Sequence, residues 1–151
     1  MIVIQQATEK DVQSILPLVE SYWNFENIDG FEPEKVGIQL RRLLAESNIG
    51  SGWIAVCGDS VVGYLLAVYV FSLEHLGLTA EIDEFFVLPS FRGSSVGGKL
   101  LEAAEAEFFR VGCTNVSLQL AKQNQAGRKF YHRHQYTERS EYELLDKMLR
   151  C

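Results

Sequence analysis

Residues 87–101 read VLPSFRGSSVGGKLL and are the most informative segment of the chain. It ends a strand-like apolar segment (78–89) and begins a helix-like segment rich in leucine, alanine and glutamate. A strand followed by a tight turn and a helix N-terminus presents backbone N–H groups and the positive end of the helix dipole to an anion. The turn holds three glycines that permit close backbone approach and two serines that add hydroxyl donors: Gly93, Gly97, Gly98, Ser94 and Ser95. We therefore predict a phosphate-binding turn.

Two common nucleotide-binding patterns do not fit this turn. It lacks the Rossmann pattern GxGxxG, and it does not lie near the start of the chain. The Walker A pattern comes closer, since residues 93–99 read GSSVGGK, but Leu100 stands where that pattern needs a hydroxyl to bind magnesium. Nucleotide hydrolysis is not favoured.

Length and composition indicate one globular domain covering residues 1–151. The chain has 47% hydrophobic and 23% charged residues, as ordinary globular proteins do. The start lacks the pattern of a signal peptide, and the most apolar segment, 61–71, is too short to span a bilayer. We expect a cytoplasmic protein without a membrane partner.

The metal-binding residue types do not form a recognisable metal or disulfide pattern. Cys57, Cys113 and Cys151 are far apart and include no CxxC pair. His132 and His134 are two residues apart, which on a helix points them about 200° away from each other. We expect neither a metal site nor a disulfide framework.

Charge is distributed unevenly along the chain. Residues 1–91 carry 13 acidic and 4 basic side chains, a balance of −9, whereas residues 92–151 carry 7 acidic and 10 basic ones, a balance of +3. This asymmetry suits a site that joins an anionic cofactor to a cationic substrate, although two solvated faces would account for it equally well. We expect no nucleic-acid partner.

The hydrophobic pattern predicts alternating strands and helices. Strands are expected at 1–7, 52–57, 61–71, 78–89, 114–120 and 142–149, and helices after a Thr8/Asp11 cap, from Pro33, at 94–112 and at 124–134. This order indicates an α/β (α+β) protein with a mixed central sheet of six to seven strands and helices on both faces.

Two motifs in this order resemble the GNAT superfamily of N-acetyltransferases. The family's loop for the acetyl-CoA pyrophosphate, Q/R-x-x-G-x-G/A, is matched from Arg92 to Gly97, with Ser95 in place of the middle glycine. Its second signature, N-x-x-A-x-x-x-Y, is matched by NQAGRKFY from Asn124 to Tyr131, with Gly127 in the alanine position. The order of elements also follows the family, so the resemblance covers essentially all 151 residues.

The resemblance implies a GNAT fold that binds acetyl-CoA as a co-substrate, without a metal. The fourth strand is expected to splay from its neighbour, so that its backbone pairs with the pantetheine amides. A small residue at 127 would let the pantetheine arm pass, and Ser95 would weaken cofactor binding. The expected cofactor-binding residues are Phe86, Val87, Leu88, Arg92, Gly93, Ser94, Ser95, Val96, Gly97, Gly98 and Asn124.

Acyl transfer to an amine needs a deprotonated amine and a proton for the leaving thiolate. The resemblance makes Tyr131 the general acid. In AEIDEFF (80–86), alternation places Glu81 and Asp83 on the face of Phe85, and Glu84 on the opposite face. Because the family has a catalytic glutamate at either matching position, Glu81 and Asp83 are joint candidates for the base, directly or through water; attraction of a cationic acceptor is their alternative role.

The aromatic and acidic loop between the first two helices is the expected acceptor site. Its candidate lining residues are Tyr22, Trp23, Phe25, Glu26, Asp29 and Glu32. They indicate a cationic small molecule or peptide whose primary amine attacks acetyl-CoA directly in a ternary complex. The alternative is a non-catalytic acyl-CoA-binding sensor or partner module, hinted at by Ser95 and Gly127. The sequence leaves a homodimer open.

Overall fold

The computed structural model describes residues 1–149 of the chain. They fall into two compact units, Met1–Gln119 and the segment that begins at Leu120. No helix within the described residues is both long and apolar enough to cross a membrane.

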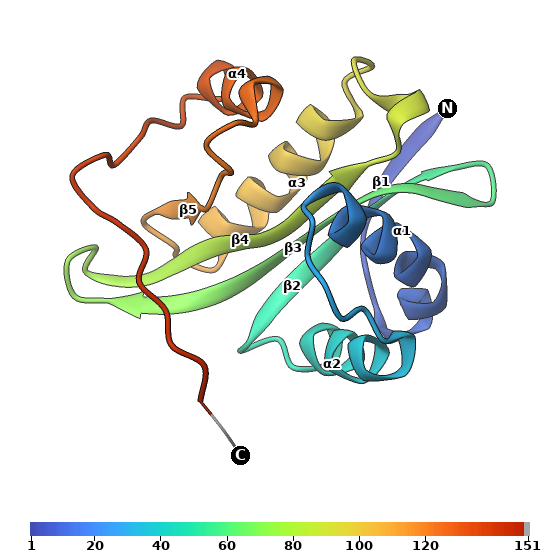
Figure 1. Cartoon of the computed structure of the whole chain (residues 1–151), viewed down its shortest axis with the longest axis horizontal. Helices are drawn as coiled ribbons and strands as arrows, with labels where there is room; N and C mark the ends of the chain where they lie inside the picture. The colour runs from blue at the N-terminus through green and yellow to red at the C-terminus, as the bar shows by residue number, and fades with distance from the viewer. Residues whose placement is uncertain (150–151) are drawn as a thin grey trace. The chain divides into compact units, whose positions relative to one another are not determined.

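The first unit is built on a five-stranded mixed sheet (Figure 1), in the order β1-β2-β3-β4-β5. The strands are β1 (Ile2–Gln6), β2 (Gly50–Cys57), β3 (Ser60–Ser72), β4 (Gly77–Val87) and β5 (Val116–Leu118). The first four are antiparallel neighbours, and β5 runs parallel to β4. A helix must therefore cross over between β4 and β5.

Helices α1 (Val12–Phe25) and α2 (Pro33–Ala45) pack together, and α1 also packs against β3 and β4. The predicted Thr8/Asp11 capping box is present and precedes a short 3-10 turn (Glu9–Asp11) that leads into α1. Pro33 occupies the first turn of α2, where its missing N–H costs no hydrogen bond. Both predicted helix starts are confirmed.

Helix α3 (Val96–Arg110) packs against the other face of the sheet. Its buried side chains are Val96, Leu100, Leu101, Ala104 and Phe108. The Phe108 ring meets Trp53 of β2 and Tyr69 of β3 edge to face, with centroids 5.5 and 6.3 Å apart. The helix begins at Val96 rather than at the predicted residue 94, because Ser94 and Ser95 belong to the turn before it.

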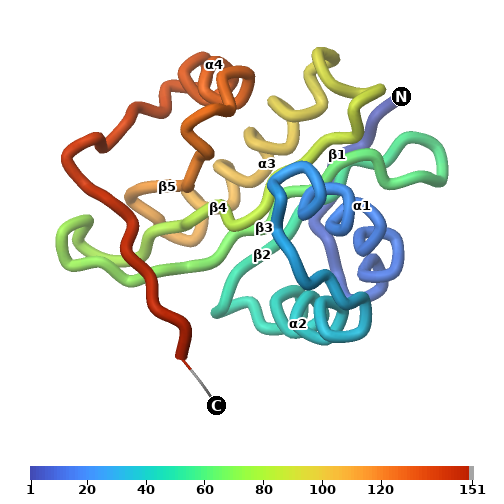
Figure 2. Tube along the Cα trace, in the orientation of Figure 1, coloured from blue at the N-terminus to red at the C-terminus, as the bar shows by residue number. Residues whose placement is uncertain are grey.

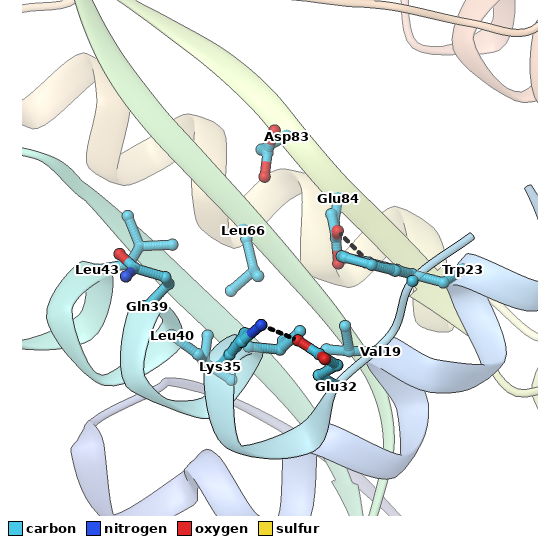
Figure 3. A pocket seen from close by; sticks show the side chains of 12 residues that line it. Val19, Trp23, Glu32, Lys35, Gln39, Leu40, Leu43, Leu66, Asp83 and Glu84 are labelled. Atoms are coloured by element: carbon cyan, nitrogen blue, oxygen red, sulfur yellow. Dashed lines mark hydrogen bonds and ion pairs between the residues drawn. The ribbon is translucent and has the colours of Figure 1, made fainter. Parts of the chain in front are cut away.

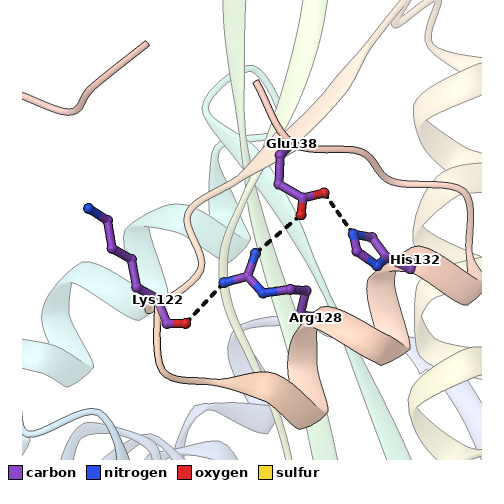
Figure 4. Close-up of polar contacts among 4 residues, drawn as sticks. All are labelled: Lys122, Arg128, His132 and Glu138. Atoms are coloured by element: carbon purple, nitrogen blue, oxygen red, sulfur yellow. Dashed lines mark hydrogen bonds and ion pairs between the residues drawn. The ribbon is translucent and has the colours of Figure 1, made fainter. Parts of the chain in front are cut away.

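The second unit contains helix α4 (Gln125–Arg133). Figure 4 shows how the chain beyond this helix is held to it: Glu138 bonds to Nε2 of His132 at 2.6 Å and to Nη1 of Arg128 at 3.4 Å. Arg128 also donates from Nη2 to the Lys122 carbonyl at 3.1 Å. One arginine thus links the segments before and after α4.

The predicted closing strand at 142–149 is wrong, and the described residues form five strands rather than six to seven. Residues 142–149 have no regular structure, and their large apolar side chains are exposed. A strand would place Asp146 on the face of Leu144, and Lys147 on the face of Leu145. Because neither face would be continuously apolar, alternation gives the segment no single face to bury.

Candidate functional site

Strand β4 loses its neighbour β5 halfway along its length. The two strands pair only from Ala80↔Val116 to Ile82↔Leu118, and Figure 2 shows β5 (orange) beside only the first part of β4. On its other side β4 stays paired with β3 as far as Val87. The pairing with β5 therefore ends where a splay was expected, and no strand of the described chain pairs with this edge of residues 83–87. Backbone groups at such an edge need another partner.

The turn after β4 presents backbone donors at the start of α3. The first hydrogen bond of the helix runs from the Lys99 N–H to the Ser95 carbonyl, at 3.0 Å. The N–H groups of Val96, Gly97 and Gly98 precede that bond and so have no acceptor within the helix. The Ser95 side chain does not cap them. Three donors and the helix dipole fit an anion such as a pyrophosphate.

Two residues of this turn adopt the left-handed backbone conformation. Gly93 has φ +75° and Ser95 has φ +69°. Glycine adopts this conformation freely, whereas serine does so at a cost. The hydroxyl of Ser94 donates to the Phe91 carbonyl and is thereby used in shaping the turn.

Arg92 joins the turn to the unpaired edge of β4. Its Nε donates to the Val87 carbonyl at 2.8 Å, and its guanidinium lies 5.3 and 5.0 Å from the ring centroids of Phe25 and Phe86. The Leu88 N–H bonds toward β3, so the preceding carbonyl faces the unpaired side. The Val87 carbonyl, one of the backbone groups expected to bind pantetheine, is thus engaged by Arg92. Phe86, another expected cofactor-binding residue, belongs to the core and is 6% exposed.

A cavity of about 350 Å³ lies among α1, α2, β3 and β4 (Figure 3). Its lining residues are Val19, Trp23, Gly30, Glu32, Lys35, Val36, Gln39, Leu40, Leu43, Leu66, Asp83 and Glu84. Two carboxylates, Asp83 and Glu84, come from β4, and an ion pair of 2.6 Å between Glu32 and Lys35 comes from the start of α2. The walls between these polar groups are mostly apolar.

A β-bulge at Asp83 sets which carboxylates face this cavity. Opposite β4, Leu66 pairs with Glu84 whereas the next residue, Ala67, pairs with Ile82, so Asp83 is an extra residue. Val68 pairs with Glu81, and residues 66 and 68 of β3 share a face. The predicted alternation is therefore wrong: Glu84 lies on the face of Glu81, and it lines the cavity together with Asp83.

Glu84 is fixed by two hydrogen bonds from neighbouring aromatic residues. Nε1 of Trp23 donates to Oε2 at 2.8 Å, and the Tyr64 hydroxyl donates to Oε1 at 2.9 Å. Burial raises the pKa of the Glu84 carboxyl, while these two bonds act to lower it. Burial and the nearby Glu84 raise the pKa of Tyr64 strongly, which keeps its hydroxyl protonated as a donor. Desolvation also raises the pKa of Asp83, although this side chain still reaches solvent.

Only some of the residues predicted to bind the acceptor line the cavity. Trp23 and Glu32 line the cavity, whereas Glu26 and Asp29 are not among its lining residues. The Tyr22 ring packs edge-on against Tyr64 and Phe86, at 6.5 and 6.1 Å, and is not among the lining residues. Phe25 packs against Phe86 at 6.3 Å, beside Arg92.

Glu81 has a different environment from the other two acids of β4. It is half-buried, and Nε2 of Gln119 donates to its Oε1 at 3.5 Å. It is not among the residues that line the cavity. The role of Glu81 as a base stays a prediction. Glu84, which does line the cavity, was not among the predicted bases, because it was expected on the opposite face of the strand.

In the second unit, Asn124 caps α4 by accepting a 2.9 Å bond from the Gly127 N–H. A Cβ atom at residue 127 would lie 2.7 Å from Nδ2 of Asn124 and 3.0 Å from Cδ1 of Leu120. A side chain at 127 would therefore require the Asn124 and Leu120 side chains to shift. The predicted contact between Asn124 and the cofactor stays a prediction.

Tyr131, the predicted acid, lies on the same helix. Its ring packs edge to face against Phe130 and Tyr136, with centroids 5.3 and 5.5 Å apart. Its role as proton donor stays a prediction.

Within residues 1–149 no three His, Cys, Asp or Glu side chains form a group that could hold a metal ion. His132 bonds to Glu138, and the His134 ring lies 4.6 Å from that of Phe130. Cys57 and Cys113 are free thiols, and Cys151 lies outside the described residues.

A model of the acetyltransferase (GNAT) family matches residues 13–136. The chain belongs to the GNAT family. It is 28% identical over 129 residues to an uncharacterised N-acetyltransferase of Archaeoglobus fulgidus, covering 85% of this chain and 88% of the relative. It is 32% identical over 85 residues to the aminoalkylphosphonate N-acetyltransferase of Salmonella typhimurium, covering 56% of this chain and 55% of that enzyme.

Solved GNAT structures share the fold. Aminoglycoside N-acetyltransferase AAC(6′)-Iy, in complex with CoA, superimposes with a TM-score of 0.84 at 18% identity, covering 100% of this chain and 96% of that one. At this identity the likeness concerns the fold alone. The resemblance to GNAT proteins inferred from the two motifs is confirmed.

Proposed function

We propose that this protein is an acetyl-CoA-dependent N-acetyltransferase that acts on a primary amine within a ternary complex. One observation carries the proposal: residues 83–87 of β4 have an unpaired backbone edge, and Asp83 and Glu84 of the same stretch line a cavity. A thioester bound along the edge would therefore meet an amine bound in the cavity within a few residues of one strand.

The cofactor side uses the turn and the edge. The N–H groups of Val96, Gly97 and Gly98 would hold the pyrophosphate at the helix N-terminus. The edge from Phe86 to Leu88 would pair with the pantetheine amides as a strand does. For this, Arg92 has to release the Val87 carbonyl, which its Nε now occupies at 2.8 Å.

The acceptor side supplies a base. The carboxylates of Asp83 and Glu84 would bind the ammonium group and take one of its protons, leaving a neutral amine. The pKa values of both carboxyls are raised toward neutral pH, so both carboxylates are stronger bases than ordinary ones. Glu81, through a water molecule, is the remaining candidate.

The transfer then proceeds by direct attack. The amine nitrogen forms a bond to the thioester carbonyl carbon, and the bond from that carbon to sulfur breaks. The nitrogen loses its second proton to the Asp83 and Glu84 carboxylates. The sulfur receives a proton from the Tyr131 hydroxyl, which is the role that the family resemblance gives this residue. The products are an N-acetyl amide and the free thiol of CoA.

The relatives support an amine acceptor. The Salmonella relative is named for an aminoalkylphosphonate, and AAC(6′)-Iy for an aminoglycoside. The substrates differ, but in both the acetyl group goes to nitrogen. We infer the same reaction type for this chain.

A thiol-release assay with acetyl-CoA and a panel of primary amines tests the proposal. We expect amine-dependent release of the CoA thiol and an N-acetylated product by mass spectrometry. Calorimetry with acetyl-CoA alone is the companion measurement. Binding without transfer to any amine would contradict catalysis and would favour an acyl-CoA-binding module.

A further inference from the structure

We propose that the acceptor carries a single positive charge on a compact apolar body, and is neither a polyamine nor an amino sugar. This rests on the proposed function and names the class of amine that the cavity beside β4 would bind.

The first argument comes from the walls of the cavity. Six of its lining side chains are apolar or aromatic, and they come from α1, α2 and β3: Val19, Trp23, Val36, Leu40, Leu43 and Leu66. Such walls gain free energy by removing apolar substrate surface from water. A hydrocarbon or aryl group is the chemistry that matches them.

The second argument comes from where the negative charge lies. Asp83 and Glu84 are adjacent on β4, so they offer one place for an ammonium group. The third carboxylate, Glu32, lies apart from these two, is largely exposed to solvent and is already paired with Lys35 at 2.6 Å (Figure 3). A second ammonium on the same substrate would lie among valine and leucine side chains and would lose its hydration without gaining a partner.

The third argument concerns hydroxyl groups. Apart from the acids and Lys35, the polar side chains of the lining are Gln39 and Trp23, and the indole N–H of Trp23 is already donated to Glu84. An amino sugar brings several hydroxyls that would displace water and find few partners. Each polar group left unpaired in a binding site costs free energy, because its hydrogen bonds to water are lost without replacement.

The first experiment compares kcat/KM of the wild-type protein for three probes: 2-phenylethylamine, spermidine and neamine. We expect 2-phenylethylamine to exceed each of the others by roughly 10²-fold, the size of discrimination that a polar mismatch in an apolar pocket readily gives. Its kcat/KM should also change little with salt, because a single paired charge in a cavity is screened less than several exposed ones.

The second experiment uses a matched pair of substitutions on α2. Val36 lines the cavity, whereas Ile38 is 59% exposed and does not. Val36→Asn should lower the ratio of kcat/KM for 2-phenylethylamine over spermidine by roughly tenfold, the effect of removing a methylene or two of apolar contact. Ile38→Asn should leave it unchanged. This ratio does not depend on the folded fraction, so partial unfolding of either variant does not disturb the comparison.

The outcomes separate this inference from the proposed function. Spermidine or neamine acetylated as well as or better than 2-phenylethylamine would overturn the inference and leave the N-acetyltransferase standing. An equal change of the ratio in both variants, or no change in Val36→Asn, would also overturn it. Acetyl-CoA binding with no amine acetylated would overturn the proposed function, and the inference with it.

Discussion

Replacing Ser95 by glycine tests the turn most directly, because this residue departs from the family motif and is strained. Its φ of +69° lies in the left-handed region. The side chain is exposed and makes no capping bond to α3, so its removal costs no such bond. Ser95→Gly therefore changes the backbone energy and little else.

The magnitude follows from two opposing contributions. A left-handed conformation costs an L-residue about 1–2 kcal/mol, which glycine does not incur. Glycine in turn makes the unfolded chain more flexible, which costs about 0.5–1 kcal/mol. We expect a net gain of about 0.5–1 kcal/mol in the free energy of unfolding, or a Tm higher by about 2–3 °C for a chain of this size.

Urea unfolding of Ser95→Gly beside Ser94→Gly provides the measurement. Ser94 does not have a positive φ, and its hydroxyl donates to the Phe91 carbonyl, so the control should lose stability. Acetyl-CoA affinity of Ser95→Gly should stay equal or become modestly tighter, since the strain is already present without the cofactor. A stability gain in both variants, or in neither, would refute the reasoning; a tenfold gain in affinity alone would mean that the free turn has another conformation.

Three further predictions concern the proposed reaction. Gly97→Glu should abolish acetyl-CoA binding in calorimetry while circular dichroism stays native, because a carboxylate at the helix N-terminus repels pyrophosphate; unchanged affinity would remove the turn from the cofactor site. Tyr131→Phe should lower kcat toward the lower end of the roughly 10²–10⁴-fold range of general acids and leave acetyl-CoA affinity nearly unchanged, whereas wild-type kcat would exclude it as the acid. Burial raises the pKa of Glu84 above its ordinary 4.5, so the folded state favours the protonated form. Its contribution to stability is therefore present below pH 4.5 and lost as pH rises through the raised pKa. Glu84→Leu should flatten this fall in urea titrations carried out at pH values above 4.5. A pH dependence identical to wild type would show that Glu84 is not desolvated.

The features that were predictable from the sequence are those fixed by near neighbours. The capping box involves Thr8 and Asp11, which are three positions apart. The start of α2 is indicated by a single residue, Pro33. The turn before α3 likewise combines its glycines with a helix that follows at once. Such local signals do not depend on how distant segments pair.

The bulge at Asp83 was not predictable for the opposite reason. Alternation assumes one residue of β4 for each residue of β3, and the extra residue shows only in the pairing of Leu66 with Glu84 and Ala67 with Ile82. One inserted residue reverses every side chain beyond it. Glu84 was therefore assigned to the wrong face, although the acid itself was visible in the sequence.

The position of this bulge links the two features of β4 on which the proposed function rests. Asp83 is the first residue of β4 beyond its pairing with β5, which ends at Ile82. A bulge increases the local twist of a strand, so the course of β4 changes at the residue where its pairing with β5 has ended. A regular β4 would instead place Glu84 on the α3 face, together with Ile82. The extra residue therefore brings Glu84 to the cavity face at the point where the edge of β4 becomes unpaired.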